Sequence, residues 1–78
     1  MENRFVIPLL TAREKEIINL IVLEYSNKEI AEKLCVSFET IKTHRKHIKL
    51  KLQVKNVAGV VRKAIMHNLL KSPLRQAL

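Results

Sequence analysis

The stretch of residues 26–52, SNKEIAEKLCVSFETIKTHRKHIKLKL, decides the fold of this chain. It contains a short segment with helical apolar spacing, a break at residues 35–37, and a longer helical segment after the break. Ser26 and Glu29 form a capping box that begins the first segment, and Ser37 supplies the N-cap of the second. A short helix, a brief break and a longer helix predict a helix-turn-helix, in which two helices meet at a steep angle.

The sequence on either side of this motif predicts two more helices. Thr11 and Glu14 form another capping box ahead of an apolar segment, and Asn56 is the expected cap of a last helix. One glycine and 4% aromatic residues are too few for a β-sandwich or barrel. We therefore expect an all-α, four-helix helix-turn-helix domain, with helices at about 12–24, 27–34, 38–52 and 57–70.

A chain of 78 residues has room for one domain. Leu9 and Leu10 are expected to pack against the core, and the Met1 start favours a free-standing protein. The expected parts are an N-terminal arm at 1–10, a helix-turn-helix domain at 11–70 with its motif at 27–46, and a flexible C-terminal tail at 71–78.

Helical periodicity assigns the residues that face the core. On the third helix, Ile41, Ile48 and Leu52 point in nearly one direction and are expected to be buried. Met66 and Leu70 fall on the outer side of the last helix. The residues expected on the core side of that helix are Val57, Val60, Val61, Ala64 and Ile65.

The net charge of +8 points to an anionic partner. Lys and Arg number 15 against 7 Asp and Glu, while 47% apolar residues exclude a disordered basic tail. The single cysteine excludes an internal disulfide, and neither a signal peptide nor an apolar stretch of about 20 residues is visible. We therefore expect a cytoplasmic, nucleoid-associated protein with no membrane partner, no cofactor and no small-molecule substrate in this chain.

Half of this net charge lies on the predicted third helix. Residues 38–52 contain five Lys or Arg (42, 45, 46, 49 and 51) and one acid, Glu39. A solvated basic face is the alternative, but such faces usually alternate in sign to gain ion pairs. The pattern favours a helix in the major groove of DNA, where its N-terminal half meets base edges. RNA fits less well, because sequence-specific RNA modules use stacking aromatic residues.

Several side chains suit particular contacts with DNA. The lysines of the third helix are donors for guanine, and Thr43 offers a methyl group to thymine. Ser37 and Thr40, beside the positive end of the helix dipole, are placed to hold a phosphate. Asn27 and Lys28, at the start of the preceding helix, offer a second contact with the DNA backbone.

Four groups of residues form a highly specific combination. They are Leu10-Thr11-x-Arg13-Glu14-x-Glu16-Ile17, Ser26-Asn27-Lys28-Glu29-Ile30-Ala31-x-x-Leu34-x-Val36-Ser37, Thr40-Ile41-Lys42-x-His44 and Ile48-x-x-Lys51-Leu52. Together they resemble the LuxR/NarL/FixJ-type helix-turn-helix over roughly residues 5–70. The resemblance implies the DNA-binding domain of a bacterial transcription regulator, with double-stranded DNA as its partner and usually dimeric on a repeated operator.

The resemblance also implies roles for single positions. Lys42, Thr43 and Lys46 match the base-reading positions of the family. Because the family dimerises through its last helix, Met66 and Leu70 are expected contacts of a homodimer. The residues in or beside positions that approach phosphate are Asn27, Lys28, Ser37, Thr40, His44, Arg45 and Lys49.

The sequence departs from the family pattern at several turns. Tyr25, Cys35 and Gln53 stand where Gly is frequent, and a positive φ at such a site costs a non-Gly residue on the order of 1 kcal/mol. Cys35 is expected to be partly buried in its turn. Val57 replaces an Arg that is common in the family, so any phosphate contact or ion pair of that Arg is absent.

Other functions fit these residues less well than DNA binding. His44 and His47 lie three residues apart, but no third metal ligand is evident. No phosphate loop, carboxylate pair or activated nucleophile is visible, so we expect no enzyme. One alternative is the promoter-reading region four of a sigma factor, which would also bind core RNA polymerase. Another is a basic protein-interaction module that uses Met66 and Leu70 and does not bind DNA.

Overall fold

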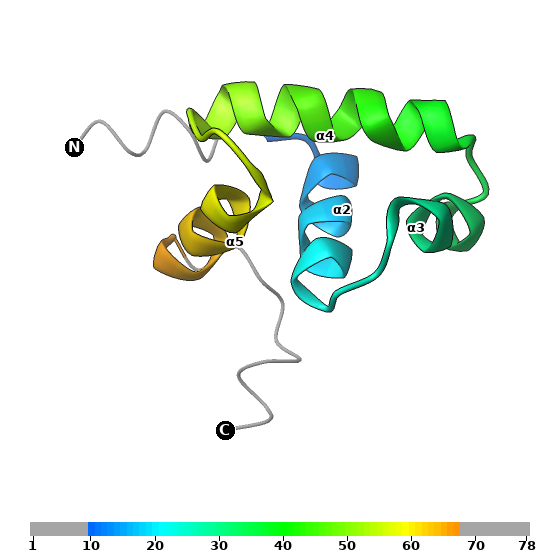
Figure 1. The fold of residues 1–78 in the computed structure, drawn as a ribbon, viewed down its shortest axis with the longest axis horizontal. Coiled ribbons are helices and arrows are strands. Elements are labelled where there is room, and N and C mark those ends of the chain that lie inside the picture. The colour runs from blue at the N-terminus through cyan, green and yellow to red at the C-terminus, as the bar shows by residue number, and fades with distance from the viewer. Residues whose placement is uncertain (1–9, 68–78) are drawn as a thin grey trace.

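The structure is a computed structural model that describes residues 10–67. These residues form four helices and no strand: α2 (Ala12–Val22), α3 (Asn27–Leu34), α4 (Phe38–Leu52) and α5 (Val57–Met66). Figure 1 shows α4, the longest helix, running along one side of the molecule with α2, α3 and α5 beneath it. All three shorter helices contact α4, and α2 also contacts α5. The expected all-α helix-turn-helix fold is confirmed.

Each helix begins at the residue that the sequence predicted as its cap. Two of the caps are complete capping boxes, because Thr11 with Glu14 and Ser26 with Glu29 exchange hydrogen bonds in both directions. The Ser37 hydroxyl accepts from the Thr40 amide at 3.0 Å, which begins α4. Local side-chain chemistry therefore marks where the helices start.

Two helix ends differ from the prediction. The first helix ends at Val22 rather than at 24, because Glu24 has a φ of 69° and the chain turns there. The last helix ends at Met66, with His67 as its C-cap, rather than at 70. Residues 68–78, and with them Leu70 and the predicted tail, lie outside the described residues, as do the arm at 1–9 and Leu9.

The core lies between α4 and the other three helices. Ile41, Ile48 and Leu52 are completely buried, as the periodicity predicted, and Leu10 is buried at the start of the described chain. The other buried apolar residues are Ile17, Ile18, Leu20 and Ile21 from α2, Ile30 and Ala31 from α3, and Val60 and Ala64 from α5.

The predicted core face of α5 is too wide. Val60 and Ala64 are buried and Val61 is half-buried, but Val57 and Ile65 are exposed. Ile65 follows Ala64 by one residue and therefore lies about 100° around the helix from it. Val57 shares the direction of Ala64 but stands in the first turn, where it borders a small pocket. Only a narrow stripe of α5 reaches α2 and α4.

Three non-Gly residues have left-handed backbone conformations. Cys35 and Gln53, both with a φ of 58°, have the positive φ that was expected at their turn positions. In the first turn it is Glu24, with a φ of 69°, and not Tyr25 that has this conformation. The Tyr25 amide instead donates to the Leu20 carbonyl at 3.0 Å and closes the turn. Cys35 is exposed rather than partly buried.

Replacing Gln53 by Gly is expected to raise the free energy of unfolding by about 0.5–1 kcal/mol. Gln53 ends α4 in a left-handed conformation that costs nothing to Gly. Urea unfolding measures the change. The matched control is Ala58→Gly at an exposed right-handed helical position, where the same residue should destabilise by about 0.5–1 kcal/mol. Destabilisation by Gln53→Gly would contradict the strain at this turn.

Candidate nucleic-acid interface

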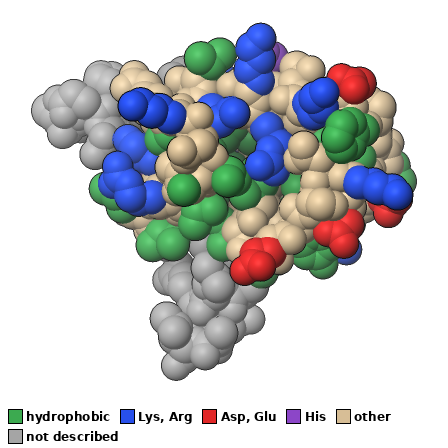
Figure 2. All heavy atoms as spheres, viewed as in Figure 1, with side chains coloured by type: hydrophobic (Ala, Val, Ile, Leu, Met, Phe, Trp, Pro, Cys, Tyr) green, Lys and Arg blue, Asp and Glu red, His purple; other side chains and the backbone are tan. Residues whose placement is uncertain are grey.

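The outer face of α4 presents the three residues expected to read bases. Lys42, Thr43 and Lys46 are all exposed. Relative to buried Ile41 they lie about 100°, 200° and 140° around the helix, which places them on the side turned away from the core. Figure 2 shows Lys and Arg side chains gathered over the region of α4. A helix that is supported along its length from one side leaves the other side free to enter a groove.

Four of the expected phosphate contacts lie at the starts of α3 and α4. Ser37 and Thr40 belong to the N-terminal turn of α4, and their hydroxyl oxygens are 2.8 Å apart. Lys28 is exposed in the first turn of α3. Asn27 precedes it and is half-buried, and its side-chain oxygen has no hydrogen-bond partner among the described residues. The N-termini of α3 and α4 therefore each combine oriented backbone dipoles with polar side chains, which favours binding of anions.

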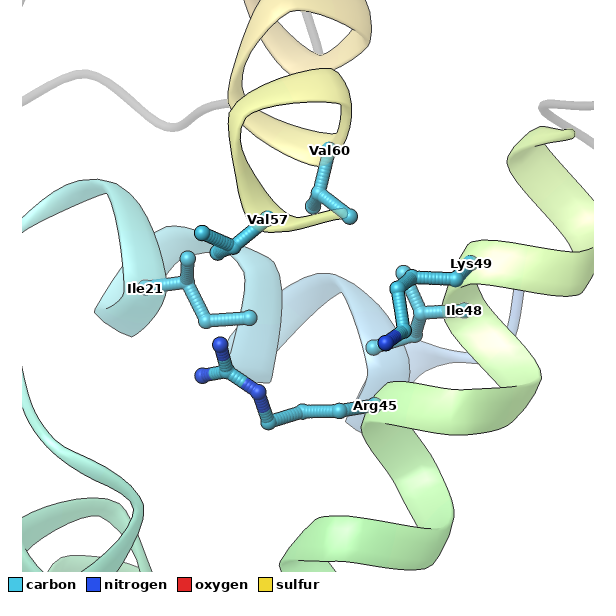
Figure 3. A pocket seen from close by; sticks show the side chains of 6 residues that line it. All are labelled: Ile21, Arg45, Ile48, Lys49, Val57 and Val60. Carbon is cyan, nitrogen blue, oxygen red and sulfur yellow. The ribbon is translucent and has the colours of Figure 1, made fainter. Parts of the chain in front are cut away.

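Arg45 and Lys49 are turned toward a groove between α2, α4 and α5. Figure 3 shows the Arg45 guanidinium pointing toward Ile21 and Val57, with Lys49 on the same side of α4. Burial among these side chains lowers the pKa of Arg45, because a guanidinium loses hydration of its charge there. Arg45 still carries its charge at neutral pH, and it has no carboxylate partner within residues 10–67.

Lys51 was counted among the positive charges of α4, but its side chain forms an ion pair within the fold. Its ammonium group donates to both carboxylate oxygens of Glu14, at 2.9 and 3.0 Å. The Glu14 side chain is 5% exposed and that of Lys51 is 31% exposed. This ion pair joins the start of α2 to the end of α4, so the Lys51 charge stabilises the fold.

Glu14 is held in its charged form by this arrangement. Burial raises the pKa of its carboxyl, but hydrogen bonds from Lys51 and from the Thr11 amide favour the ionised form. The positive charge of Lys51 and the nearby His44 act in the same direction, and the pKa lies below its ordinary value. His44 is half-buried, in agreement with its expected position at the edge of the core.

The sequence reasoning missed three residues of the exposed α4 surface. Phe38 is 46% exposed at the first position of α4, and Leu50 is 67% exposed on the outer side. His47 is exposed and lines a shallow depression together with Thr43 and His44. The helical periodicity that predicts burial of Ile41 places Leu50 on the opposite side of α4. The exposure of Leu50 could therefore have been predicted in the same way.

The described residues also bear on the other expectations. Within residues 10–67, no group of three or more His, Cys, Asp or Glu side chains is arranged to hold a metal ion. In the same range, no helix combines the length and the apolar composition needed to cross a bilayer. Met66 is 57% exposed on α5, and its sulfur accepts from Arg62 at 3.1 Å.

Two curated transcription or regulatory proteins are similar to this chain in sequence. The transcriptional regulatory protein MctR of Rhizobium johnstonii is 48% identical over 60 residues, covering 77% of this chain and 28% of the relative. The oxygen regulatory protein NreC of Staphylococcus carnosus is 47% identical over 62 residues, covering 80% of this chain and 29% of the relative. The chain therefore spans less than a third of the length of these curated relatives.

Solved structures and a family profile give the same assignment. The transcription factor GerE superposes with a TM-score of 0.76 at 33% identity, over 81% of this chain and 94% of that one. The response regulator ChrA of a heme-sensing two-component system superposes with a TM-score of 0.74 at 40% identity, over 77% of this chain and 30% of that one. The profile described as "Bacterial regulatory proteins, luxR family" matches residues 8–64. The chain thus belongs to the luxR family of bacterial regulatory proteins and contains its helix-turn-helix domain.

Proposed function

We propose that this chain binds double-stranded DNA sequence-specifically, with α4 in the major groove, as the DNA-reading part of a bacterial transcription regulator. The observation that carries the proposal is the outer face of α4, where Lys42, Thr43 and Lys46 are exposed together. The major groove is about 12 Å wide and admits one helix, and lysine and threonine side chains suit guanine and thymine edges. The protein acts as a non-enzymatic regulator in the cytoplasm, at the nucleoid.

The affinity comes mainly from the DNA backbone. The proposed phosphate contacts are Asn27, Lys28, Ser37, Thr40, His44, Arg45 and Lys49. Contacts of this kind release counterions, so the logarithm of the binding constant should fall linearly with the logarithm of salt concentration, by about 0.9 per phosphate. A steep slope is expected, since two helix N-termini and several cations contribute.

Selection from a pool of random duplexes at about 150 mM salt, followed by sequencing, tests the proposal. At this salt concentration the non-specific attraction is strongly reduced. Enrichment of one motif, in one or two half-sites, is the expected result. Binding without enrichment would mean that the chain coats DNA non-specifically. Absence of binding would contradict the proposal and favour the protein-interaction module. A pull-down with core RNA polymerase separately tests the alternative of a sigma-factor region four.

The same chain forms a homodimer on its operator in this proposal. Met66 and its neighbour Ile65 are exposed apolar side chains on α5, the helix expected to carry the dimer contact. Leu70, the other expected contact, lies outside the described residues. A second copy would remove this apolar surface from water.

Replacing Met66 by Asp is expected to weaken binding to a two-half-site duplex about tenfold, because a carboxylate is costly to desolvate in an apolar contact. Binding to a duplex with one half-site should change little, and it serves as the internal control. Gel-shift titrations of both duplexes measure the two affinities. Equal losses on the two duplexes would show that Met66 does not act through a dimer.

A further inference from the structure

The N-terminal tip of α4 carries an aromatic ring beside a lysine. Phe38 is the first residue of the helix, and the Lys42 ammonium nitrogen lies 5.6 Å from the centroid of its ring. The same nitrogen lies 3.7 Å from a carboxylate oxygen of Glu39. Side chains on a helix lean toward its N-terminus, so Lys42 reaches back over the turn that holds Phe38 and Glu39. The three side chains form one cluster at the tip, here called the tip cluster.

The fold does not require the Phe38 ring. It is 46% exposed, and it is not among the partly buried residues packed against the core. Exposure of a single apolar residue is common and by itself indicates nothing. The second observation is its position, because the N-terminal residues of a recognition helix are the ones that contact base edges. The ammonium group of Lys42, one of the proposed base-reading residues, lies over this ring and not against the core.

The chemistry of the major groove restricts what such a ring can read. Guanine, cytosine and adenine present hydrogen-bonding groups there, and the apolar group on a base edge is the C5-methyl of thymine. A phenyl ring has no hydrogen-bond donor, so it discriminates through that methyl. Because Lys42 lies over the ring, its ammonium group would lie near the base pair next to the one that the ring contacts. If that base pair contains guanine, N7 and O6 can accept hydrogen bonds from the ammonium group.

We propose that Phe38 is a specificity-determining residue whose ring contacts a thymine methyl next to the base pair that Lys42 reads. The inference rests on the proposed function and deepens it. The competing explanation is a surface cation–π pair that only stabilises the start of the helix. The two explanations differ in whether the dependence of DNA binding on a thymine methyl group requires the Phe38 ring.

Replacing single thymines by deoxyuridine tests the contact directly. Deoxyuridine lacks the methyl group and keeps the base pairing. In the duplex selected by the wild-type chain, each thymine of a half-site is changed in turn. Besides any thymine that Thr43 contacts, one position is expected at which deoxyuridine weakens wild-type binding about three- to tenfold, as the loss of one buried methyl predicts. Phe38→Ala should bind the thymine duplex with a similar loss and should be insensitive to deoxyuridine at that position.

Leu50→Ala is the matched control, because Leu50 is another exposed apolar residue of α4 near its other end. It should keep the full deoxyuridine effect. Thermal unfolding checks that Phe38→Ala is folded, and the wild-type arm needs no variant at all. If no thymine position is sensitive, or if Phe38→Ala keeps the sensitivity, the inference is wrong. A uniform loss on all duplexes would also overturn it, since the ring would then contact the DNA backbone.

The failure of the inference is distinguishable from failure of the proposed function. A wild-type chain that selects an operator but shows no methyl dependence contradicts the role of Phe38 alone. A wild-type chain that selects no operator contradicts sequence-specific binding, and the role of Phe38 falls with it.

Discussion

Glu14→Gln is expected to lower the free energy of unfolding by about 2–3 kcal/mol, a large share of the stability of so small a domain. The substitution keeps the size of the side chain and can keep the capping box, because Gln also serves at that position. It removes the negative charge that pairs with Lys51 at 2.9 Å. Urea unfolding at pH 7 measures the difference.

The size of this effect follows from burial on one side of the pair. Removing one partner of a fully buried ion pair costs about 3–5 kcal/mol, because the other charge remains without compensation. The Glu14 side chain is 5% exposed, but Lys51 is 31% exposed and can turn partly toward water. The loss of unfolding free energy caused by Glu14→Gln should therefore be smaller than for a fully buried pair and clearly larger than for a surface pair.

Glu16→Gln provides the matched control. Glu16 lies in the same helix and pairs with Arg13 at 3.3 Å, but both side chains are exposed. Exposed pairs of this kind contribute about 0–1 kcal/mol. Similar losses from Glu14→Gln and Glu16→Gln would contradict the structural role of the bridge between α2 and α4.

The Glu14 contribution should depend on pH with a definite sign. The pKa of Glu14 in the folded chain lies below its ordinary value of 4.5, because Lys51, the Thr11 amide and His44 favour the ionised form. A lowered folded-state pKa adds stability that is complete above the unfolded-state pKa and disappears as pH falls through the folded-state pKa. The difference in unfolding free energy between wild type and Glu14→Gln should therefore shrink below about pH 4.5.

The helix starts could be predicted from the sequence because their causes are local. Thr11 with Glu14 and Ser26 with Glu29 are three residues apart, and each pair satisfies backbone amides without help from the rest of the chain. The buried direction of α4 was likewise readable from Ile41 and its helical repeats. Side chains spaced three or four residues apart are enough to predict the helix starts and the buried side of α4.

The partner of a charged side chain such as Lys51, and the width of the buried face of α5, could not be predicted in the same way. Lys51 pairs with a residue 37 positions away, and nothing near it in sequence marks that partner. Ile65 was assigned to the core because it is apolar, but the core contact of α5 is limited by how α2 and α4 approach it. Phe38 was overlooked for a related reason, since an apolar residue is not usually sought on a binding face.

Lys46→Ala is expected to weaken binding to the selected operator by about 1–3 kcal/mol, which corresponds to a loss of roughly five- to 150-fold. Lys46 is exposed on the outer side of α4, and within residues 10–67 no ion-pair partner restrains it. Its removal should leave the fold intact. Base preference should relax at one position of each half-site, which repeated selection with the variant would show.

The matched control removes an equal charge from another face. Lys33 belongs to α3, lies over the Tyr25 ring at 5.4 Å, and borders Glu16 of α2 and not the outer side of α4. Lys33→Ala should lower specific and random-duplex affinity alike, and only slightly, because it changes the long-range attraction. Lys46→Ala should reduce the ratio of the two affinities. If Lys46→Ala instead lowers both equally and reduces the salt slope by about one, Lys46 holds a phosphate and the reading of bases falls to Lys42 and Thr43.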